Sequence, residues 1–597
     1  MTFENVKIHI LFGSQTGNAQ DLAERIARES KRFYFQSHAK PLDEFSLSDL
    51  VQERCIVFVC STTGQGEEPD NMKSFWKLLL KRSLPCNLLG NLRFAVIGLG
   101  DSSYAKFNFV AKRLQKRLSQ LGGQSLLPLG LADDQHDLGY DAVADLWMQN
   151  LWTKLLEDYP LPAGVRPLSK NLPINPRWTV TSEAKFLEPP NEPGRIRSIF
   201  YSTKPSNEFN AKVLENCRQT DPSHFQDVRL IRFQTEGQEY APGDLLVLRP
   251  KNLAWKVKEF KDALAESKVS IPDSALVQLS ETSENTPVPD ALKAEVTFQQ
   301  LCEEYFDLFA IPRRRVFQLL SQITDSDLEK EKCLEFCSAE GQQDMYSYTS
   351  RPRRNTVEVL RDFPHATKNI TLDVLFEIFP PIKPREFSIA SSFKAVKNEV
   401  HILVAVVKYK TNLKTERIGL CSNYLADLSA GDQVATWIKP GCFKFPQTLD
   451  NPVIMVGPGT GVAPFRSFIL EVADSATALD LILFYGCRYK AKDFLCKNDF
   501  EHLSRSGNLT LICAFSRDQD EKIYVQDKIR EHGHAVWQAL ERKASIFVAG
   551  NSKNMPQQVR QAFMDVCVQH GQLSELEAAH LMERMEKASR YQTECWS

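Results

Sequence analysis

The sequence predicts a multidomain α/β protein in which two units of alternating strands and helices lie on either side of a β-barrel. Three observations indicate this class. Short apolar runs separated by helical patterns occur at residues 1–160 and again at 449–597. The apolar runs between these regions are typical of a barrel and are interrupted by a long helical stretch at about 254–380. The chain of 597 residues has room for about four domains of roughly 150 residues, or three with one enlarged.

Composition excludes several classes of protein. Lys and Arg number 73 against 75 Asp and Glu, a net charge of −2, which excludes a generally basic nucleic-acid binder and an acidic disordered chain. No apolar run approaches the ~20 residues of a membrane helix. The N-terminus lacks a secretory signal and a myristoylation start, and the C-terminus lacks a prenylation box. We therefore expect a protein without a membrane anchor.

The cysteines indicate a reducing compartment. The 14 cysteines are scattered and form no CxxC pair. Cys55 and Cys60 flank an apolar run that reads as a buried strand, and Cys333 and Cys337 share a helical face. No His or Cys spacing is typical of a zinc or iron–sulfur site. We expect free thiols, a cytoplasmic location and no bound metal.

The N-terminal domain is expected to span residues 1–160 and to form a parallel, doubly wound sheet. Each apolar run ends in a turn rich in Gly, Ser or Thr, and a helical pattern follows it, which is typical of this architecture. The expected strands are 8–12, 55–60 and 94–98, and the expected helices are 21–32, 72–82 and 110–121.

Three further segments complete the predicted organisation. Prolines recur through residues 161–204, which predicts a linker that is extended or semi-flexible and packs no core. Residues 205–448 are expected to form the barrel with the helical insert, and residues 449–597 return to strand–turn–helix alternation. The strands expected in these two domains are 228–233, 245–248, 387–389, 402–407, 453–456, 481–484, 509–513 and 546–549.

Three loops of the first domain point to an anionic, planar ligand. The loop Gly13–Asn18 presents amides and hydroxyls at the start of a helix, and it lacks the GK[ST] ending of a nucleotide P-loop. Taken alone, this loop fits either a phosphate or a simple helix cap. The loops 61–66 and 98–108 follow the next two strands, so all three lie at the carboxyl ends of parallel strands, where such folds bind ligands. Tyr104 in the third loop offers a ring to cover a flat ligand.

The residues of these loops resemble the FMN-binding loops of flavodoxin-type domains. The matching stretches are SQTG, TTGQG and GLGDSSYAKFN. Thr63 departs from the pattern, because related reductases often carry an aromatic residue there, so one face of the flavin is expected to lack a stacking ring. The FMN site that the resemblance implies consists of Ser14, Gln15, Thr16, Gly17, Asn18, Ser61, Thr62, Thr63, Gly64, Leu99, Gly100, Asp101, Ser102, Ser103, Tyr104, Ala105, Lys106, Phe107, Asn108 and Asp134.

The central domain contains a sequence that resembles the Arg-x-Tyr-Ser box of ferredoxin-reductase barrels. An Arg suits a pyrophosphate through bidentate hydrogen bonds, and amides at a helix start suit the same group. The resemblance implies that the aromatic residue stacks on the isoalloxazine and that the Ser reaches its reacting edge. The FAD site so implied consists of Arg353, Arg385, Glu386, Phe387, Ser388, Gly419, Leu420, Cys421 and Ser422.

The last domain resembles the NADPH-binding domain of the same reductases. The glycines of Val456–Arg466 allow a tight turn and a close approach of a pyrophosphate. A hydroxyl and two cations downstream resemble the family's 2′-phosphate pocket and favour NADPH over NADH. Gln558 stands where relatives carry an Asp contact, so that role is not expected of it. The expected contacts are Thr460, Ser516, Arg517, Lys522, Ile523, Tyr524, Val525 and Gln526.

The C-terminal residues resemble the acidic-x-Trp terminus of the family, where a Trp lies over the FAD. The resemblance implies that Ser388, Glu594 and Trp596 take part in hydride transfer. Ala549 replaces the family's Cys in Val548–Asn551, which we expect to slow hydride transfer modestly.

The whole chain resembles a diflavin reductase, and most closely the soluble member of cytosolic iron–sulfur protein assembly. This implies electron flow from NADPH to FAD, then FMN, then a protein acceptor, the Fe–S protein anamorsin. The linker fits a domain that moves between FAD and its partner. Reductases for methionine synthase or a haem monooxygenase, and a flavoprotein scaffold or redox sensor that does not turn over, remain alternatives. An acidic set on the FMN-side loops, which fits either a basic acceptor or ordinary solvated charge, comprises Glu67, Glu68, Asp70, Asp133, Asp134 and Asp137.

Overall fold

The computed structural model of the chain forms two compact units, which are described separately. The first unit contains residues 1–193, 261–298 and 310–379, and the second contains 194–260, 299–309 and 380–597. The residues that the structure describes are 7–63, 66–104, 106–136, 139–169, 176–183, 198–199, 207–281, 288–338, 340–413, 415–448, 450–473, 480–551 and 554–596.

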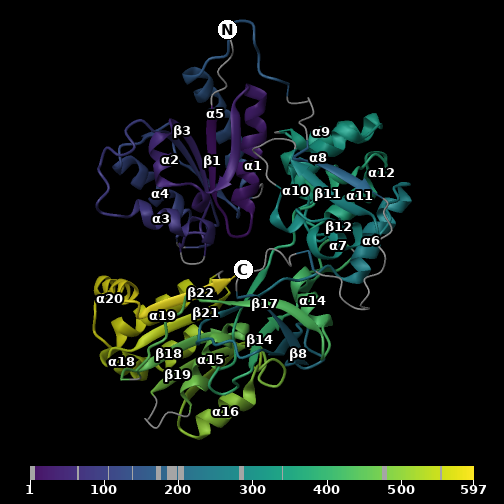
Figure 1. Cartoon of the computed structure of the whole chain (residues 1–597). Coiled ribbons are helices and arrows are strands. Elements are labelled where there is room, and N and C mark those ends of the chain that lie inside the picture. Colours follow the sequence, from purple (N-terminus) through teal and green to yellow (C-terminus); the bar gives the residue numbers. More distant parts are fainter. Residues whose placement is uncertain are drawn as a thin grey trace. The chain divides into compact units, whose positions relative to one another are not determined.

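A six-stranded parallel sheet forms the N-terminal part of the first unit (Figure 1, purple to blue). The strand order is β2-β1-β3-β4-β5, and β6 also pairs with β4. All of these pairs are parallel, which confirms the predicted doubly wound class. The strands are β1 (Lys7–Gly13), β2 (Gln36–Pro41), β3 (Cys55–Ser61), β4 (Arg93–Gly100), β5 (Gln124–Ser125) and β6 (Gly130–Asp133).

Helices bury both faces of this sheet. Along β3, Val57 and Val59 enter the core formed with α1 and α5, whereas Ile56 and Phe58 enter the core formed with α3 and α4. A strand buried on both faces explains the continuous apolar runs in the sequence. The helices are α1 (Asn18–Ser30), α2 (Leu47–Gln52), α3 (Lys73–Leu79), α4 (Phe109–Gln120) and α5 (Asp141–Asp158).

Part of the predicted linker forms a strand. β7 (Trp178–Glu183) pairs with β11 (Leu276–Glu281), which also pairs with β12 (Val296–Thr297). Trp178 is 7% exposed, and its ring packs edge-on against Phe376 with centroids 6.0 Å apart. The prediction that no residue of this segment packs was therefore wrong for β7, because its prolines flank the strand rather than interrupt it.

Helices make up most of the predicted insert. Arg177, just before β7, connects the insert to the N-terminal sheet domain. Its guanidinium pairs with Glu377 at 3.0 Å and with Glu24 of α1 at 2.9 Å. The helices of the insert are α6 (Ala254–Glu266), α7 (Phe298–Gln300), α8 (Arg314–Ile323), α9 (Asp327–Cys337), α10 (Gln342–Tyr348), α11 (Thr356–Asp362), α12 (Pro364–Thr367) and α13 (Leu372–Ile378).

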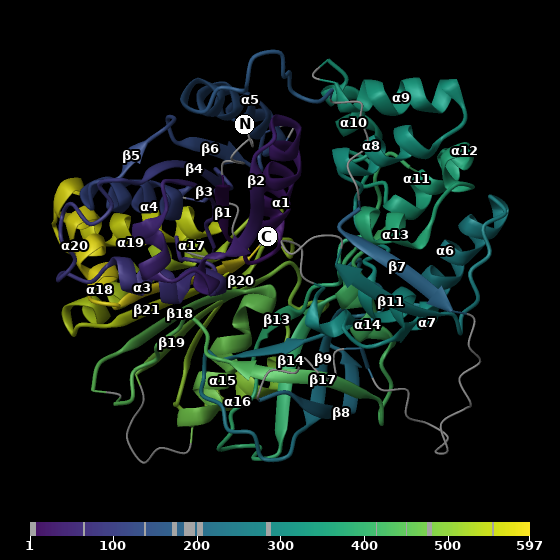
Figure 2. The ribbon, with the colours of Figure 1, turned by 45° about the horizontal axis from the view of Figure 1, so that its top comes forward.

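The second unit contains the predicted barrel (Figure 2). Its antiparallel sheet has the order β13-β10-β17-β8-β9-β14, and a bridge between Ile389 and Ile402 joins the two outer strands, which closes the barrel. The strands are β8 (Phe209–Arg218), β9 (Val228–Gln234), β10 (Leu245–Leu248), β13 (Arg385–Ser388), β14 (Glu399–Ala405) and β17 (Gln433–Lys439), beside a short pair formed by β15 (Lys408–Tyr409) and β16 (Arg417–Ile418) and the helix α14 (Leu420–Asp427).

A five-stranded parallel sheet of order β20-β19-β18-β21-β22 completes the second unit (Figure 1, green to yellow). Its last strand was not predicted, since residues 591–596 contain no continuous apolar run. The strands are β18 (Val453–Pro458), β19 (Leu481–Cys487), β20 (Thr510–Phe515), β21 (Ser545–Asn551) and β22 (Tyr591–Trp596). The helices are α15 (Ala463–Val472), α16 (Lys497–Arg505), α17 (Val525–Glu531), α18 (Gly533–Glu541), α19 (Met555–Gln569) and α20 (Glu575–Lys587).

The structure can be compared with the expectations of free thiols and of no membrane-spanning helix. All 14 cysteines are free, and burial raises the pKa of Cys55 and of Cys60 to about 12, which keeps these thiols protonated. Among the described residues, no helix has the length and apolar character needed to cross a membrane.

Candidate active site and cofactor sites

The loop after β1 is shaped to hold an anion. The Gly17 amide donates to Ser14 Oγ at 3.0 Å, and the Ser14 amide donates to Asn71 Oδ1 at 2.9 Å. Gly17 precedes α1 at a φ of 98°, which glycine adopts without strain. Within the described residues, no side chain caps the start of α1, so its first amides are available to a ligand. Thr16 is exposed at this loop.

The three predicted FMN loops converge at one edge of the sheet. Ser61 Oγ donates to the Gly13 carbonyl at 3.3 Å, and the Thr62 amide donates to the Leu99 carbonyl at 3.1 Å. The Asp134 amide in turn donates to the Gly100 carbonyl at 2.8 Å. The structure therefore brings the three predicted loops side by side, whereas Gly64 and Ala105 lie outside the described residues.

Asn108 holds the third loop in shape. It has a φ of 52°, and its amide group donates to the Ala132 carbonyl at 3.0 Å. A Cβ on Gly98 would lie 2.7 Å from Asn108 Oδ1, so this close approach requires glycine. Tyr104, from the same loop, is half-buried. Burial and the neighbouring Asp101 raise the pKa of Asp134.

The acidic set on these loops is partly neutralised. Glu68 pairs with Arg113 at 2.8 Å, and Asp70 pairs with Lys73 at 2.7 Å. Asp133 accepts from the Ser102 amide at 2.9 Å. These contacts favour the second interpretation from the sequence, in which the carboxylates are ordinary loop charge. Asp137 lies outside the described residues.

The predicted FAD residues of the second unit lie in two segments, the strand β13 and the start of α14. Gly419 precedes this helix, and its own amide donates to the Val407 carbonyl at 3.0 Å. Burial raises the pKa of Cys421 to about 12, while the charge of Arg385 acts in the opposite direction. The Arg385 guanidinium is thus within electrostatic reach of the first turn of α14, and both groups suit a pyrophosphate. Arg353 lies in the first unit, at a φ of 55°, and its part in the FAD site stays a prediction.

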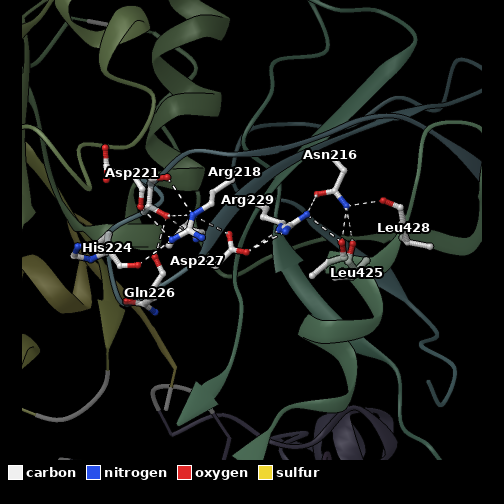
Figure 3. A network of polar contacts seen from close by, with 12 residues as sticks. Asn216, Arg218, Asp221, His224, Gln226, Asp227, Arg229, Leu425 and Leu428 are labelled. Carbon is white, nitrogen blue, oxygen red and sulfur yellow. Dashed lines mark hydrogen bonds and ion pairs between the residues drawn. The ribbon is translucent and has the colours of Figure 1, made fainter. Parts of the chain in front are cut away.

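A polar network anchors the other end of α14 (Figure 3). Asn216 Nδ2 donates to the carbonyls of Leu425 and Leu428 at 2.9 and 2.8 Å, and Arg229 donates to the Ala426 carbonyl at 3.1 Å. These bonds give further partners to carbonyls at the end of the helix, and they place positive charge at its negative end. The network from β8 and β9 therefore fixes the helix whose opposite end faces the predicted pyrophosphate position.

Two residues predicted for hydride transfer are in direct contact. Ser388 Oγ of β13 donates to Glu594 Oε1 of β22 at 3.2 Å. Parallel pairing with β21 sets Glu594 opposite the buried Ala549, the position at which the family's Cys was expected. The Ser388 hydroxyl and the Glu594 carboxylate thus meet next to position 549, where this chain has Ala and no thiol.

Trp596 is held in a regular strand and is not a loose tail. It is the register partner of Asn551, two residues beyond the pair formed by Ala549 and Glu594. Its ring is half-buried against the apolar core beneath β18 and β21. Strand alternation puts Glu594 and Trp596 on the same face of the sheet, and Cys595 on the other.

The turn after β18 has the shape of a dinucleotide-binding loop. A Cβ on Gly461 would lie 2.2 Å from the Ala549 carbonyl, so no other residue fits there. Pro458 leads into the short helix η7 (Gly459–Val462), in which Thr460 is half-buried, and α15 follows directly. This is the strand–turn–helix arrangement in which a pyrophosphate meets a helix start.

Two cations lie exposed beyond β20. Hydrogen bonds from the amides of Ser516 and Arg517 to the carbonyls of Cys487 and Arg488, each 2.9 Å long, hold this loop at the carboxyl end of the sheet. Arg517 and Lys522 are exposed, and neither has an ion-pair partner in the described part of the chain. Tyr524 is 43% exposed beside them. The buried Gln526 donates to Gln558 Oε1 at 3.1 Å, so Gln558 contacts a predicted site residue without itself being predicted.

Sequence reasoning missed two residues that contact the predicted phosphate loop Ser14–Asn18. Asn71 orders the loop through the Ser14 amide. Arg313 donates from Nη2 to Asn18 Oδ1 at 2.7 Å, although 295 positions separate the two residues. No spacing or local pattern could reveal either contact, since both arise from tertiary packing.

A flavodoxin-like sheet, an antiparallel barrel with a helical insert and a second parallel sheet with a glycine-rich turn together define the class of diflavin reductases. Family models agree domain by domain. The flavodoxin model matches residues 10–147, the FAD binding domain model matches 202–424, and the oxidoreductase NAD-binding domain model matches 455–561.

The chain belongs to the NADPH-dependent diflavin oxidoreductase family. It is similar to NADPH-dependent diflavin oxidoreductase 1 of Danio rerio, with 45% identity over 98% of this chain and 99% of the relative. The protein of the same name in Mus musculus is 43% identical over the same shares, and that of Arabidopsis thaliana is 38% identical over 99% of each chain. This chain is therefore an oxidoreductase that uses FMN, FAD and NADPH.

Proposed function

We propose that this chain passes electrons from NADPH to the Fe–S protein anamorsin in cytosolic iron–sulfur protein assembly. The domain order and the full-length similarity to the diflavin oxidoreductases support the reductase part of this proposal. The motifs GLGDSSYAKFNFVAK and VGPGTGVAPFR, which resemble those of the reductase in this pathway, support the acceptor. A cytoplasmic location belongs to the same proposal.

The hydrogen bond between Ser388 and Glu594 is the observation that carries the reductase mechanism. Bound flavins supply a hydride acceptor and single-electron transfer, which no side chain can provide. The hydroxyl of Ser388 and the carboxylate of Glu594 then orient the nicotinamide and stabilise the charge that develops beside it. Ala549 adds bulk but no polar group at this position.

The site assignments and domain boundaries made from the sequence complete the proposal. Residues 1–160 hold FMN, residues 205–448 hold FAD, residues 449–597 hold NADPH, and the segment 161–204 connects the first two domains. The convergence of the three FMN loops supports the first assignment. The exposed cations Arg517 and Lys522 support a 2′-phosphate pocket, because NADH offers them no anion.

The acceptor can be tested with purified proteins. The full chain, loaded with both flavins, is mixed with oxidised anamorsin and NADPH without oxygen, and the visible absorbance of the Fe–S protein is followed. We expect bleaching within seconds that depends on both NADPH and the reductase. Methionine synthase and a haem monooxygenase serve as competing acceptors. Faster reduction of either one would contradict the proposed acceptor, and failure of NADPH to bleach the bound flavin would contradict reductase activity altogether.

Replacement of Trp596 by Ala is expected to improve the use of NADH selectively. Nicotinamide must displace the indole from the flavin, and only NADPH has a 2′-phosphate anchor to offset that cost. An aromatic stacking contact is worth about 0.5–1.5 kcal/mol, so the preference for NADPH should shrink by about twofold to tenfold. Turnover with NADPH falls if nicotinamide leaves more slowly.

Steady-state kinetics with both coenzymes measure this change. Cys595→Ala is the matched control, because its side chain lies in the same strand on the opposite face. FAD content should stay at one equivalent in both variants. An unchanged ratio of the two kcat/KM values in Trp596→Ala would mean that the indole does not control the access of nicotinamide to the flavin.

A further inference from the structure

The FMN phosphate loop contains no cation of its own. Ser14–Asn18 offers hydroxyls, amides and the start of α1, and all of these are dipoles. A dianionic phosphate bound by dipoles alone gains from any positive charge held nearby. The carboxylate of Asp21, one turn further along α1, acts in the opposite direction and repels an anion at this helix start.

Arg313 supplies a cation at this point from a distant part of the sequence. It precedes α8 in the helical insert, within the same compact unit as α1. Its Nη1 lies 2.5 Å from Asp21 Oδ2, and its Nη2 donates to Asn18 Oδ1 at 2.7 Å. The side chain is 40% exposed, so its charge faces solvent beside the phosphate loop as well as Asp21.

The contact between α8 and the flavodoxin helices does not depend on Arg313 alone. Arg314 pairs with Asp145 of α5, which also accepts from Gln342 at 2.8 Å and from Arg25 at 2.6 Å. Several polar contacts besides that of Arg313 therefore hold the insert against these helices. Replacement of Arg313 should leave this contact largely intact.

Arg313 also determines the charge state next to the loop. Burial alone would raise the pKa of Asp21, but the guanidiniums of Arg313 and Arg28 outweigh it and lower the pKa. The hydroxyl of Tyr140 donates to the same carboxylate at 3.2 Å. Asp21 is thus ionised at neutral pH, and Arg313 pairs with this negative charge beside the loop.

We propose that Arg313 is a specificity residue for the phosphate of FMN. It belongs to the helical insert and supplies a positive charge to the flavodoxin loop Ser14–Asn18. Its guanidinium neutralises Asp21 and adds positive charge beside Asn18, so that the loop prefers the phosphorylated flavin over riboflavin. By linkage, bound FMN strengthens the contact between the insert and α1 as much as that contact strengthens FMN binding. This inference rests on the proposed place of the phosphate in the loop Ser14–Asn18.

Flavin affinity gives a direct test. The full chain is stripped of FMN with FAD retained, and the dissociation constants of FMN and riboflavin are measured by fluorescence titration. Arg313→Gln should weaken FMN about threefold to tenfold at low salt and change riboflavin less than twofold. The loss should shrink at about 0.5 M salt, because screening weakens exposed charges. Equal losses for both flavins, or no loss, would overturn the proposal.

Two matched variants separate the charge of Arg313 from its packing. Lys332→Gln removes one charge from the insert at a site whose partner, Glu335, lies in the same helix, and it should change neither constant. Arg313→Lys keeps the charge and should retain most of the preference for FMN. If Arg313→Gln loses FAD or folds poorly, Arg313→Lys replaces it as the test. If Arg313→Gln has no effect while Thr16→Asp expels FMN, this inference fails and the loop assignment stands.

Discussion

Thr16→Asp is expected to expel FMN from the protein while FAD stays bound. Thr16 is exposed in the loop before α1, so the new side chain disturbs no packing. The loop offers only amides and hydroxyls, and a fixed carboxylate there would face the phosphate directly. Two unit charges in contact near a protein surface repel by about 2–4 kcal/mol, which corresponds to a loss of roughly thirtyfold to a thousandfold in affinity.

Released flavins can be separated and quantified from the purified variant. Thr16→Asn is the matched control, because it has nearly the same size and polarity as Asp but no charge. We expect the Asp variant to contain less than a tenth of an equivalent of FMN and a full equivalent of FAD, and the Asn variant to keep both. One equivalent of each flavin in Thr16→Asp would contradict the assignment of this loop.

Arg517→Ala should weaken the use of NADPH far more than that of NADH. Arg517 is exposed near Lys522 and has no ion-pair partner among the described residues, so its removal breaks no ion pair there. A charge-assisted hydrogen bond to a 2′-phosphate is worth about 1.5–3 kcal/mol, which predicts a loss of roughly tenfold to a hundredfold in kcat/KM for NADPH.

The comparison of the two coenzymes isolates the role of the phosphate. NADH lacks the 2′-phosphate, so its kcat/KM should change less than twofold in the same variant. Arg505→Ala is a suitable control for general surface charge, since Arg505 is exposed at the end of α16 and its ion-pair partner, Glu501, lies in the same helix. Equal losses for both coenzymes would show that the pocket lies elsewhere.

Strong local patterns made most of the fold predictable. The apolar runs of β1, β3 and β4 are buried on both faces by helices, and such strands are readable without any partner information. The barrel strands β9 and β10 were also located within a residue. Among the strands that were missed, β7 and β22 contain no continuous apolar run and owe their structure to pairing with β11 and β21.

The residues of the candidate sites also fall into two groups, those that a local pattern predicted and those that it did not. Glycine-rich turns such as Pro458–Val462 were recognisable because close backbone approaches leave no room for a side chain. The acidic set on the predicted FMN loops was harder to interpret, since Glu68 has a cationic partner, Arg113, that only the folded chain brings to it. Asn71 and Arg313 could not be predicted at all.

The sequence by itself determined the class, the order of the domains and the glycine- and hydroxyl-rich loops at which we expect the cofactors to bind. These depend on short stretches in which the spacing of apolar, glycine and hydroxyl residues dictates the local backbone. Only the tertiary structure decided which distant side chains meet: Ser388 with Glu594, Asn216 with the end of α14, and Arg313 with Asn18. Such contacts depend on long loops closing in three dimensions, and no local pattern encodes their geometry.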